Sequence, residues 1–294
     1  MENKYYRISE TKENIYRFTS PENVFFELIV GSDRAMLIDT GHGFGNIKGA
    51  VREITDKPLV IVNTHGHVDH TCGNYQFKEE IYLAPEDMEL MRKHNTRSFR
   101  EYTVRLQEHA TDWETGKEFY GLPDGFDEEQ YTVGAAARLQ QMVFQPLKDG
   151  MTFDLGGKTV HTIATPGHTR GCMSFLLEEE NWLYVGDAAN PFLWLFDEYA
   201  ADRKTLIRSY DKILDLNPSR IYAGHMPFPV GTEDIKLYKR TALEADYEQG
   251  IPFRTPLMPQ CEDIRVCVLG GRSMEEIGTP GFSAILIDSS RKQL

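Results

Sequence analysis

Three histidines and an aspartate fall within six positions of the segment NTHGHVDHTCGN, residues 63–74, directly after an apolar run typical of a strand. The chain has only nine histidines. Crowded imidazoles repel one another when charged, and a neutral cluster gains little from packing. A bound cation removes this cost, because each neutral ring offers a lone pair and the carboxylate offers negative charge. The segment therefore predicts a metal site, and the fold has to bring the remaining ligands to this strand end.

The chain around the cluster alternates between strand and helix patterns. Residues 22–30 and 35–40 are β-rich runs, and residues 41–55 begin with glycines and continue as a helix pattern. The apolar run at 59–64 suits a strand that is buried on both faces. Strand, helix and strand form a βαβ unit of an α/β sheet, in which ligands gather beyond the carboxyl ends of the strands. The histidine cluster lies at such an end.

The rest of the chain divides by its patterns into a helical insertion, a second set of strands and a short extension. No strand-like alternation is apparent at about 86–143, which predicts a helical insertion that could act as a lid. A later helix is expected from Thr232 to Gln249, with Thr232 as its N-cap. We therefore expect one catalytic domain over residues 1–250 and a C-terminal β extension, 251–294, packed on the same domain.

Composition excludes several classes of function. A chain of 294 residues with 40% hydrophobic content can bury a substantial core. The net charge of −13, without any block of Lys and Arg, repels a phosphate backbone, so we expect no nucleic-acid partner. The first ten residues lack an apolar signal segment, and no stretch approaches membrane-spanning length. The four cysteines show no disulfide-framework spacing. These features predict a reduced, cytoplasmic protein; a homodimer stays open.

Three further candidate ligands each follow a predicted strand in a glycine-bearing loop. They are His168 in TPGHTRG, Asp187 in YVGDAA and His225 in YAGH. Taken singly, each is more often an ordinary loop residue than a ligand. Because strand ends in an α/β layer converge, all three can meet the cluster, and their joint occurrence favours ligation.

Within the cluster, spacing separates two pairs of ligands. His65 and His67 are two apart on an extended segment, so their side chains can point the same way. Asp69 and His70 lie just beyond, where the chain turns, and can face a second metal.

The other histidines do not stand beside further candidate ligands in the sequence. We interpret His161 as structural and His94 and His109 as residues of the insertion helices. His42 is interpreted as a loop residue.

The ordered motifs LIDTG, THGHVDH, TPGHTRG, VGDA and AGH resemble those of the metallo-β-lactamase superfamily over roughly residues 15–250. The resemblance implies an α/β fold, the αββα sandwich, with a dinuclear site on one edge. It implies a first metal held by His65, His67 and His168, a second held by Asp69, His70 and His225, and Asp187 bridging both. Asp39 of LIDTG resembles the family's aspartate that orients a ligand histidine.

The motifs also discriminate between branches of the superfamily. Most true β-lactamases carry Cys or Ser at the position of Asp187, and redox di-iron members typically carry Glu at the position of His67. What remains resembles the neighbourhood of glyoxalase II, lactonases and phosphodiesterases. The resemblance then implies a hydrolase with two divalent transition-metal ions, zinc first and manganese or iron open.

Such a metal pair implies a bridging hydroxide that attacks a small carboxylic ester, lactone or thioester. Asp69 could pass a proton to the leaving group. A phosphodiester substrate is one alternative, and a mononuclear iron oxygenase acting on a persulfide is another.

Substrate contacts are predicted at three residues, each with a competing interpretation. Phe192 and Trp194 alternate in NPFLWLF after Asp187, and they form either an apolar substrate wall or a buried strand face. Arg170 could pair with a substrate carboxylate or phosphate, although a surface salt bridge is the commoner role. Basic residues of the insertion, Arg100 among them, could reach over the metals if the insertion is a lid.

Overall fold

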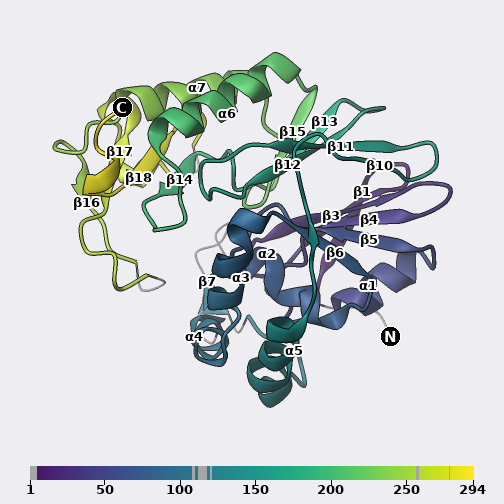
Figure 1. The fold of residues 1–294 in the computed structure, drawn as a ribbon. Coiled ribbons are helices and arrows are strands. Elements are labelled where there is room, and N and C mark those ends of the chain that lie inside the picture. The colour runs from purple at the N-terminus through teal and green to yellow at the C-terminus, as the bar shows by residue number, and fades with distance from the viewer. Residues whose placement is uncertain (1–4, 108–109, 112–117, 120, 256–257, 278) are drawn as a thin grey trace.

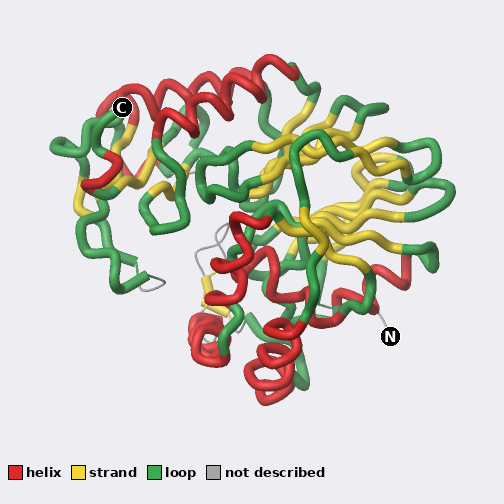
Figure 2. Tube along the Cα trace, in the orientation of Figure 1, coloured by secondary structure: helices red, strands yellow, loops and turns green. Residues whose placement is uncertain are grey.

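The computed structural model describes residues 5–107, 110–111, 118–119, 121–255, 258–277 and 279–294. Two large β-sheets face each other, and helices cover the outer face of each (Figures 1 and 2). The fold is therefore the αββα sandwich expected from the sequence. No helix in the described ranges has the length and apolar character that crossing a membrane requires.

The first sheet has seven strands in the order β1-β2-β3-β4-β5-β6-β9. They are β1 Arg7–Lys12, β2 Ile15–Thr19, β3 Phe25–Val30, β4 Ala35–Ile38, β5 Leu59–Val62, β6 Glu80–Leu83 and β9 Gln145–Pro146. The pairs from β1 to β4 are antiparallel and those from β4 to β9 are parallel. Strands β3, β4 and β5 are buried at every position, as the apolar run of β5 predicts for that strand.

The second sheet has five strands in the order β10-β11-β12-β13-β15. They are β10 Thr152–Asp154, β11 Thr159–Ala164, β12 Met173–Leu177, β13 Trp182–Gly186 and β15 Arg220–Ala223. Side chains from both sheets, among them Ile38, Val62 and Phe175, fill the space between the layers. This shared core sets the two sheets against each other, so that their strand ends meet at one edge.

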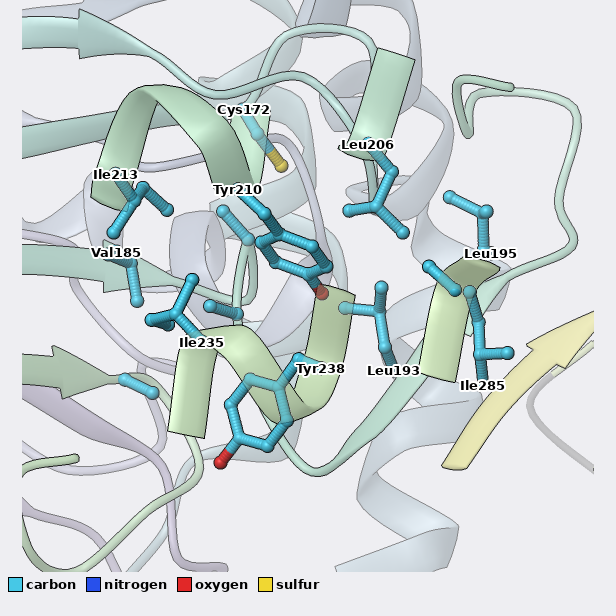
Figure 3. Packing of buried hydrophobic residues seen from close by; sticks show 14 of the residues in the cluster. Cys172, Val185, Leu193, Leu195, Leu206, Tyr210, Ile213, Ile235, Tyr238 and Ile285 are labelled. Atoms are coloured by element: carbon cyan, nitrogen blue, oxygen red, sulfur yellow. The ribbon is translucent and has the colours of Figure 1, made fainter. Parts of the chain in front are cut away.

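Three helices cover the outer faces of the sandwich. Helix α1 (Ile47–Ile54) buries Ile47 and Val51 in the core cluster that also holds residues of the first sheet, and the side chain of Asn46 caps its first turn. Helices α6 (Arg203–Leu216) and α7 (Thr232–Glu244) lie over the second sheet. Figure 3 shows Tyr210 of α6 and Tyr238 of α7 in one cluster with Val185 of β13.

The insertion is mainly helical, as predicted, but a minimal hairpin interrupts it. Its elements are η2 Pro85–Asp87, α3 Met88–His94, α4 Arg97–Gln107, β7 Ala110–Thr111, β8 Glu118–Phe119, the π-helical turn η3 Gln130–Gly134, and α5 Ala135–Gln141. Strands β7 and β8 pair antiparallel, which the absence of alternation in the sequence did not predict. His109 lies outside the described residues.

A third sheet joins the end of the chain to the rest. Its order is β14-β18-β17-β16, with β14 Phe192–Leu195, β16 Ile251–Pro252, β17 Arg265–Val268 and β18 Ala284–Ile287. The 3-10 turns η4 Leu269–Gly271, η5 Met274–Glu276 and η6 Ser289–Arg291 complete this part. Because β14 pairs in parallel with β18, the C-terminal strands extend a sheet that begins beside the strand end of Asp187.

Candidate metal centre

The seven predicted ligands come from four loops at one edge of the sandwich, and the structure brings them together. His65 and His67 follow β5, and the short helix α2 (Val68–Thr71), continued by η1 (Cys72–Gln76), begins directly after His67. The chain turns here because Gly66 lies against the backbone of the insertion: a Cβ at Gly66 would lie 2.7 Å from the carbonyl oxygen of Asp87. The remaining three ligands follow β11, β13 and β15.

Three buried imidazoles form the first group. Nδ1 of His67 lies 3.0 Å from Nε2 of His65 and 2.8 Å from Nε2 of His168. Burial lowers the pKa of His65 well below its ordinary value and that of His168 to about 4, so both rings stay neutral and keep a lone pair for a ligand. The three nitrogen atoms converge on one point, as in a tris-histidine metal site.

The second group pairs two histidines with two carboxylates. Nε2 of His225 lies 3.1 Å from Oδ2 of Asp69 and 3.2 Å from Oδ2 of Asp187. Nε2 of His70 lies 3.6 Å from a carboxylate oxygen of each aspartate. Oδ2 of Asp187 is also 3.6 Å from Nε2 of His168 in the first group. Asp187 therefore stands between the two groups, where a bridging ligand would be.

Unsatisfied buried atoms test whether a metal fits these residues. Among the described residues, Nε2 of His70 and Oδ1 of Asp187 are buried and have no hydrogen-bond partner. Leaving a buried polar group unpaired costs about 1–3 kcal/mol. A cation between these atoms would satisfy both, and nitrogen and carboxylate donors suit zinc, manganese or iron. The residues present therefore fit metal binding.

Acceptors hold the outer nitrogen of three ligand rings. Oδ2 of Asp39 accepts hydrogen bonds from Nδ1 of His70 at 2.7 Å and from Oγ1 of Thr64 at 2.6 Å. The backbone carbonyl of Trp194 accepts from Nδ1 of His168 at 2.8 Å. Such contacts fix the tautomer and the orientation of a ligand ring. The structure thus places Asp39 in contact with His70, a candidate ligand; that it orients a metal ligand stays a prediction.

The third acceptor, Asp197, was not predicted from the sequence. Its Oδ2 lies 3.3 Å from Nε2 of His67, and its Oδ1 accepts hydrogen bonds from the backbone N–H groups of Tyr199 and Ala200 at 2.7 Å. Burial raises the pKa of Asp197, but these contacts outweigh that effect and hold it well below the ordinary range. Asp197 follows an apolar run, and no local pattern distinguishes it from a loop aspartate.

Asp87 of η2 connects two loops that carry candidate ligands. Its carboxylate accepts hydrogen bonds from the backbone of Gly66 at 2.8 Å, from Oγ1 of Thr169 at 2.6 Å and from the backbone of Gly171 at 2.8 Å. Gly66 separates His65 from His67, and Thr169 follows His168. One buried carboxylate therefore fixes the position of the loop that carries His65 and His67 relative to the loop that carries His168.

His94 also lies at the centre, although its position in the sequence indicated only an insertion helix. Its ring stacks on His67 with centroids 5.1 Å apart and on Phe99 with centroids 4.3 Å apart. By contrast, His161 pairs with Glu178 on the surface of β11, in keeping with a structural role. His42 stacks on Phe44, and its backbone carbonyl accepts from Tyr131.

The predicted substrate contacts have partners within the protein. Arg170 donates a hydrogen bond to the backbone carbonyl of Glu198 at 2.5 Å. This contact is neither a surface salt bridge nor a contact with substrate, the two roles expected for Arg170. Phe192 and Trp194 lie 6.1 and 6.4 Å from the ring of Phe253, so they pack against the C-terminal part. Whether any of the three contacts a substrate stays a prediction.

A fold of two sheets with a histidine- and aspartate-rich strand edge defines a class of metal-binding α/β proteins. A family model described as the metallo-beta-lactamase superfamily matches residues 21–225, and the chain belongs to this superfamily.

Among curated proteins, the chain is 27% identical over 237 residues to the acyl-coenzyme A thioesterase MBLAC2 of Homo sapiens. The matched region covers 73% of this chain and 76% of that protein. It is 28% identical over 211 residues to an uncharacterized protein of Mycobacterium tuberculosis, covering 66% of this chain and 81% of that protein.

Solved structures are similar in fold. A metallo-beta-lactamase from Pontibacter korlensis has a TM-score of 0.57 at 14% identity and covers 81% of this chain and 99% of its own. A sec-alkylsulfatase from Pseudomonas has a TM-score of 0.57 at 15% identity and covers 82% of this chain and 42% of its own. At these identities the likeness concerns the fold alone.

Proposed function

We propose that this protein is a dinuclear metal-dependent hydrolase of a small carboxylic thioester, ester or lactone, with thioesters first. It would belong to the glyoxalase II and lactonase-like branch rather than to the true β-lactamases. The observation that carries the proposal is the convergence of two ligand groups on Asp187, which lies within 3.6 Å of a nitrogen in each. The similarity to an acyl-coenzyme A thioesterase supports a thioester over the other acyl substrates.

The metal ions and the residues around them would have separate roles in hydrolysis. When bound, two divalent cations supply a water of lowered pKa and polarise the carbonyl of the substrate. Asp69 and His225 line the open side of the site, with side chains 19% and 36% exposed. Hydrolysis transfers the water oxygen to the acyl carbon and a proton to the departing sulfur or oxygen. The carboxylate of Asp69 is placed to carry that proton.

Two other functions receive less support. A phosphodiester carries charge that a pocket usually neutralises with Lys or Arg. Three cations of the described part of the insertion have other partners: Lys93 pairs with Glu198, Arg97 pairs with Glu101, and Arg100 is buried and donates to the backbone of Cys72.

A mononuclear oxygenase would not need the second ligand group. The contacts of His225 with Asp69 and Asp187 therefore favour two metals.

An activity comparison tests the proposal. Protein loaded with zinc, manganese or iron is assayed on p-nitrophenyl acetate, an acetyl thioester, a lactone and bis-p-nitrophenyl phosphate. We expect kcat/KM to be highest on an acyl substrate. Asp187→Asn should abolish this activity, and the exposed Asp215→Asn on α6 is the matched control.

Two results would overturn the proposal. A tenfold preference for the phosphodiester, about 1.4 kcal/mol in transition-state binding, would reverse the substrate order. One iron per chain together with oxygen consumption on a persulfide would indicate the oxygenase instead.

A further inference from the structure

A cavity of about 620 Å³ lies between the insertion and the C-terminal part of the chain. One wall comes from α3 and α4 and includes His94, Phe99 and Tyr102. The opposite wall comes from Tyr199 and the segment that includes Met258 and Cys261. Its volume falls within the range of small-molecule sites, about 300–1,000 Å³. Neither wall belongs to the strand edge that carries the seven candidate ligands.

The cavity abuts the metal centre at one end. Asp197 lines the cavity and also contacts Nε2 of His67 at 3.3 Å. His94 lines it as well and stacks on the ring of His67. A group that fills the cavity therefore lies beside a candidate ligand of the first metal.

The charges of the wall are already paired. Three ionised side chains line the cavity, and each has a partner within the protein: Lys93 pairs with Glu198, and Oδ2 of Asp197 contacts Nε2 of His67. The remaining surface is largely aromatic and aliphatic, from Phe99, Tyr102 and Met258. An anionic ligand would lose water here without gaining a free cation, which is costly in a buried site. The wall therefore suits a neutral, mainly apolar occupant.

Two buried polar atoms of residues that line the cavity lack a hydrogen-bond partner within the described protein. Among the residues that the structure describes, Nδ1 of His94 and Oη of Tyr102 are buried and lack hydrogen-bond partners. Both belong to side chains of the cavity wall. Unpaired buried polar atoms of this kind are usually satisfied by water or by a ligand. Because these two atoms are themselves buried, the accessible wall of the cavity is mainly apolar.

We propose that this cavity binds the acyl group of the substrate, and that the acyl group is neutral and of medium length. The inference rests on the proposed hydrolase function and adds a specificity: the carbonyl lies at the metals, and the acyl chain extends into the space between α4 and residues 258–261. Longer neutral acyl chains are then better substrates, because each buried methylene strengthens binding.

A chain-length series tests the proposal. Thioesters of N-acetylcysteamine keep the leaving group constant and uncharged while the acyl group grows from acetyl to octanoyl. We expect kcat/KM to rise about three- to fourfold per methylene until the cavity is filled, since burying a methylene contributes about 0.8 kcal/mol. A pentanoyl ester should exceed a glutaryl ester of the same length at least tenfold. Equal rates across the series, or a preference for glutaryl, would overturn the proposal.

A filled cavity provides the matched variant. Ser98 is an exposed lining residue of α4, and Ser98→Phe places a ring in the space. We expect the ratio of kcat/KM for octanoyl over acetyl to fall at least tenfold. Ser9→Phe adds the same ring on the exposed face of β1 and should leave the ratio unchanged. An unchanged ratio in Ser98→Phe would contradict the proposal.

Binding without turnover separates this inference from the proposed function. Calorimetry with octanamide and the metal-free protein should show binding that Ser98→Phe weakens at least tenfold and Ser9→Phe does not. If no thioester, ester or lactone is hydrolysed but octanamide binds in this way, the hydrolase proposal fails and the cavity assignment stands. If thioesters are hydrolysed and octanamide does not bind, the cavity assignment is wrong.

Discussion

Single buried hydrogen-bond acceptors fix the orientation of three candidate ligand histidines. Asp39, Asp197 and the carbonyl of Trp194 each contact the outer nitrogen of a different ligand histidine. With that nitrogen held, the other ring nitrogen faces the centre. Of these acceptors, only Asp39 could be predicted, because it lies in a motif. Asp197 contacts a histidine 130 positions away, and no local pattern reports such a contact.

The substitution Asp197→Asn tests this role at one atom. The amide lacks the negative charge that favours a correctly oriented His67, so we expect metal affinity to fall about 10–100-fold. Competition with a chromophoric chelator measures the affinity, and Asp215→Asn is the control. An unchanged affinity in a folded variant would show that Asp197 does not position the ligand.

Asp69 and Arg170 should differ in kinetic effect. Asp69 contacts His225 and would carry the proton, whereas Arg170 donates to the backbone and can at most aid binding. We expect Asp69→Ala to lower kcat severely and Arg170→Ala to raise KM at most. Steady-state kinetics on the best acyl substrate decides the matter. Near-native kcat in Asp69→Ala with full metal occupancy would refute the assigned role.

At the level of elements, strands β3, β4 and β5 of the first sheet were predictable from their β-rich runs, and the continuous apolar run of β5 indicated a strand buried on both faces. The ends of the helices were less predictable from the sequence. The sequence suggested Thr232 as the N-cap of α7, but the cap is Gly231, whose N–H donates to the carboxylate of Asp234 at 2.8 Å. The helix also ends at Glu244, five residues before the expected end, and the chain there continues toward β16. Tertiary connections, rather than helix propensity, set these boundaries.

A buried ion pair between neighbouring strands should control stability. Arg17 of β2 faces Glu27 of β3 in the register, and their side chains meet at 2.6 Å. Burial raises the pKa of Glu27 to about 7, while Arg17 opposes the shift. We expect Arg17→Met to lower the free energy of unfolding by about 3–5 kcal/mol at pH 8, because a buried carboxylate is left unpaired.

The pH dependence has a definite sign. The native pKa of Glu27 exceeds its unfolded value, so the stability from this group is present at low pH and is lost as the pH rises from about 4.5 through 7. The loss in Arg17→Met should therefore be smaller at pH 5 than at pH 8, with the exposed Arg7→Met as control. Denaturant titration at both pH values measures it. An equal loss at both pH values would contradict the argument.

At the scale of the whole molecule, the resemblance of the motifs to a known family implied the αββα architecture. The convergence of strand ends in a layered sheet explained how candidate ligands far apart in the sequence could meet. The third sheet did not follow from it, because the pairing of β14 with β18 joins segments far apart in the sequence. The cavity likewise lies between two distant segments, so the sequence indicated neither its position nor its lining. Metal ligands were predictable because motifs encode them locally, whereas substrate contacts depend on long-range packing.

Metal should stabilise the entire fold. Nε2 of His70 and Oδ1 of Asp187 lack partners among the described residues, and a cation that binds only the native state adds about 2.7 kcal/mol at one hundred times its Kd. We expect zinc to raise the Tm of chelator-treated protein by several degrees, measured by differential scanning calorimetry. Asp187→Asn should lose most of this rise. A Tm that does not respond to metal would oppose native-state binding at the centre.

We expect one chain to hold two transition-metal ions at the edge of the sandwich. Elemental analysis of protein purified without chelator, and again after reconstitution and gel filtration, measures this directly. The two ligand groups around Asp187 predict about two metal ions per chain. A stoichiometry that stays below one metal per chain after reconstitution would contradict the account.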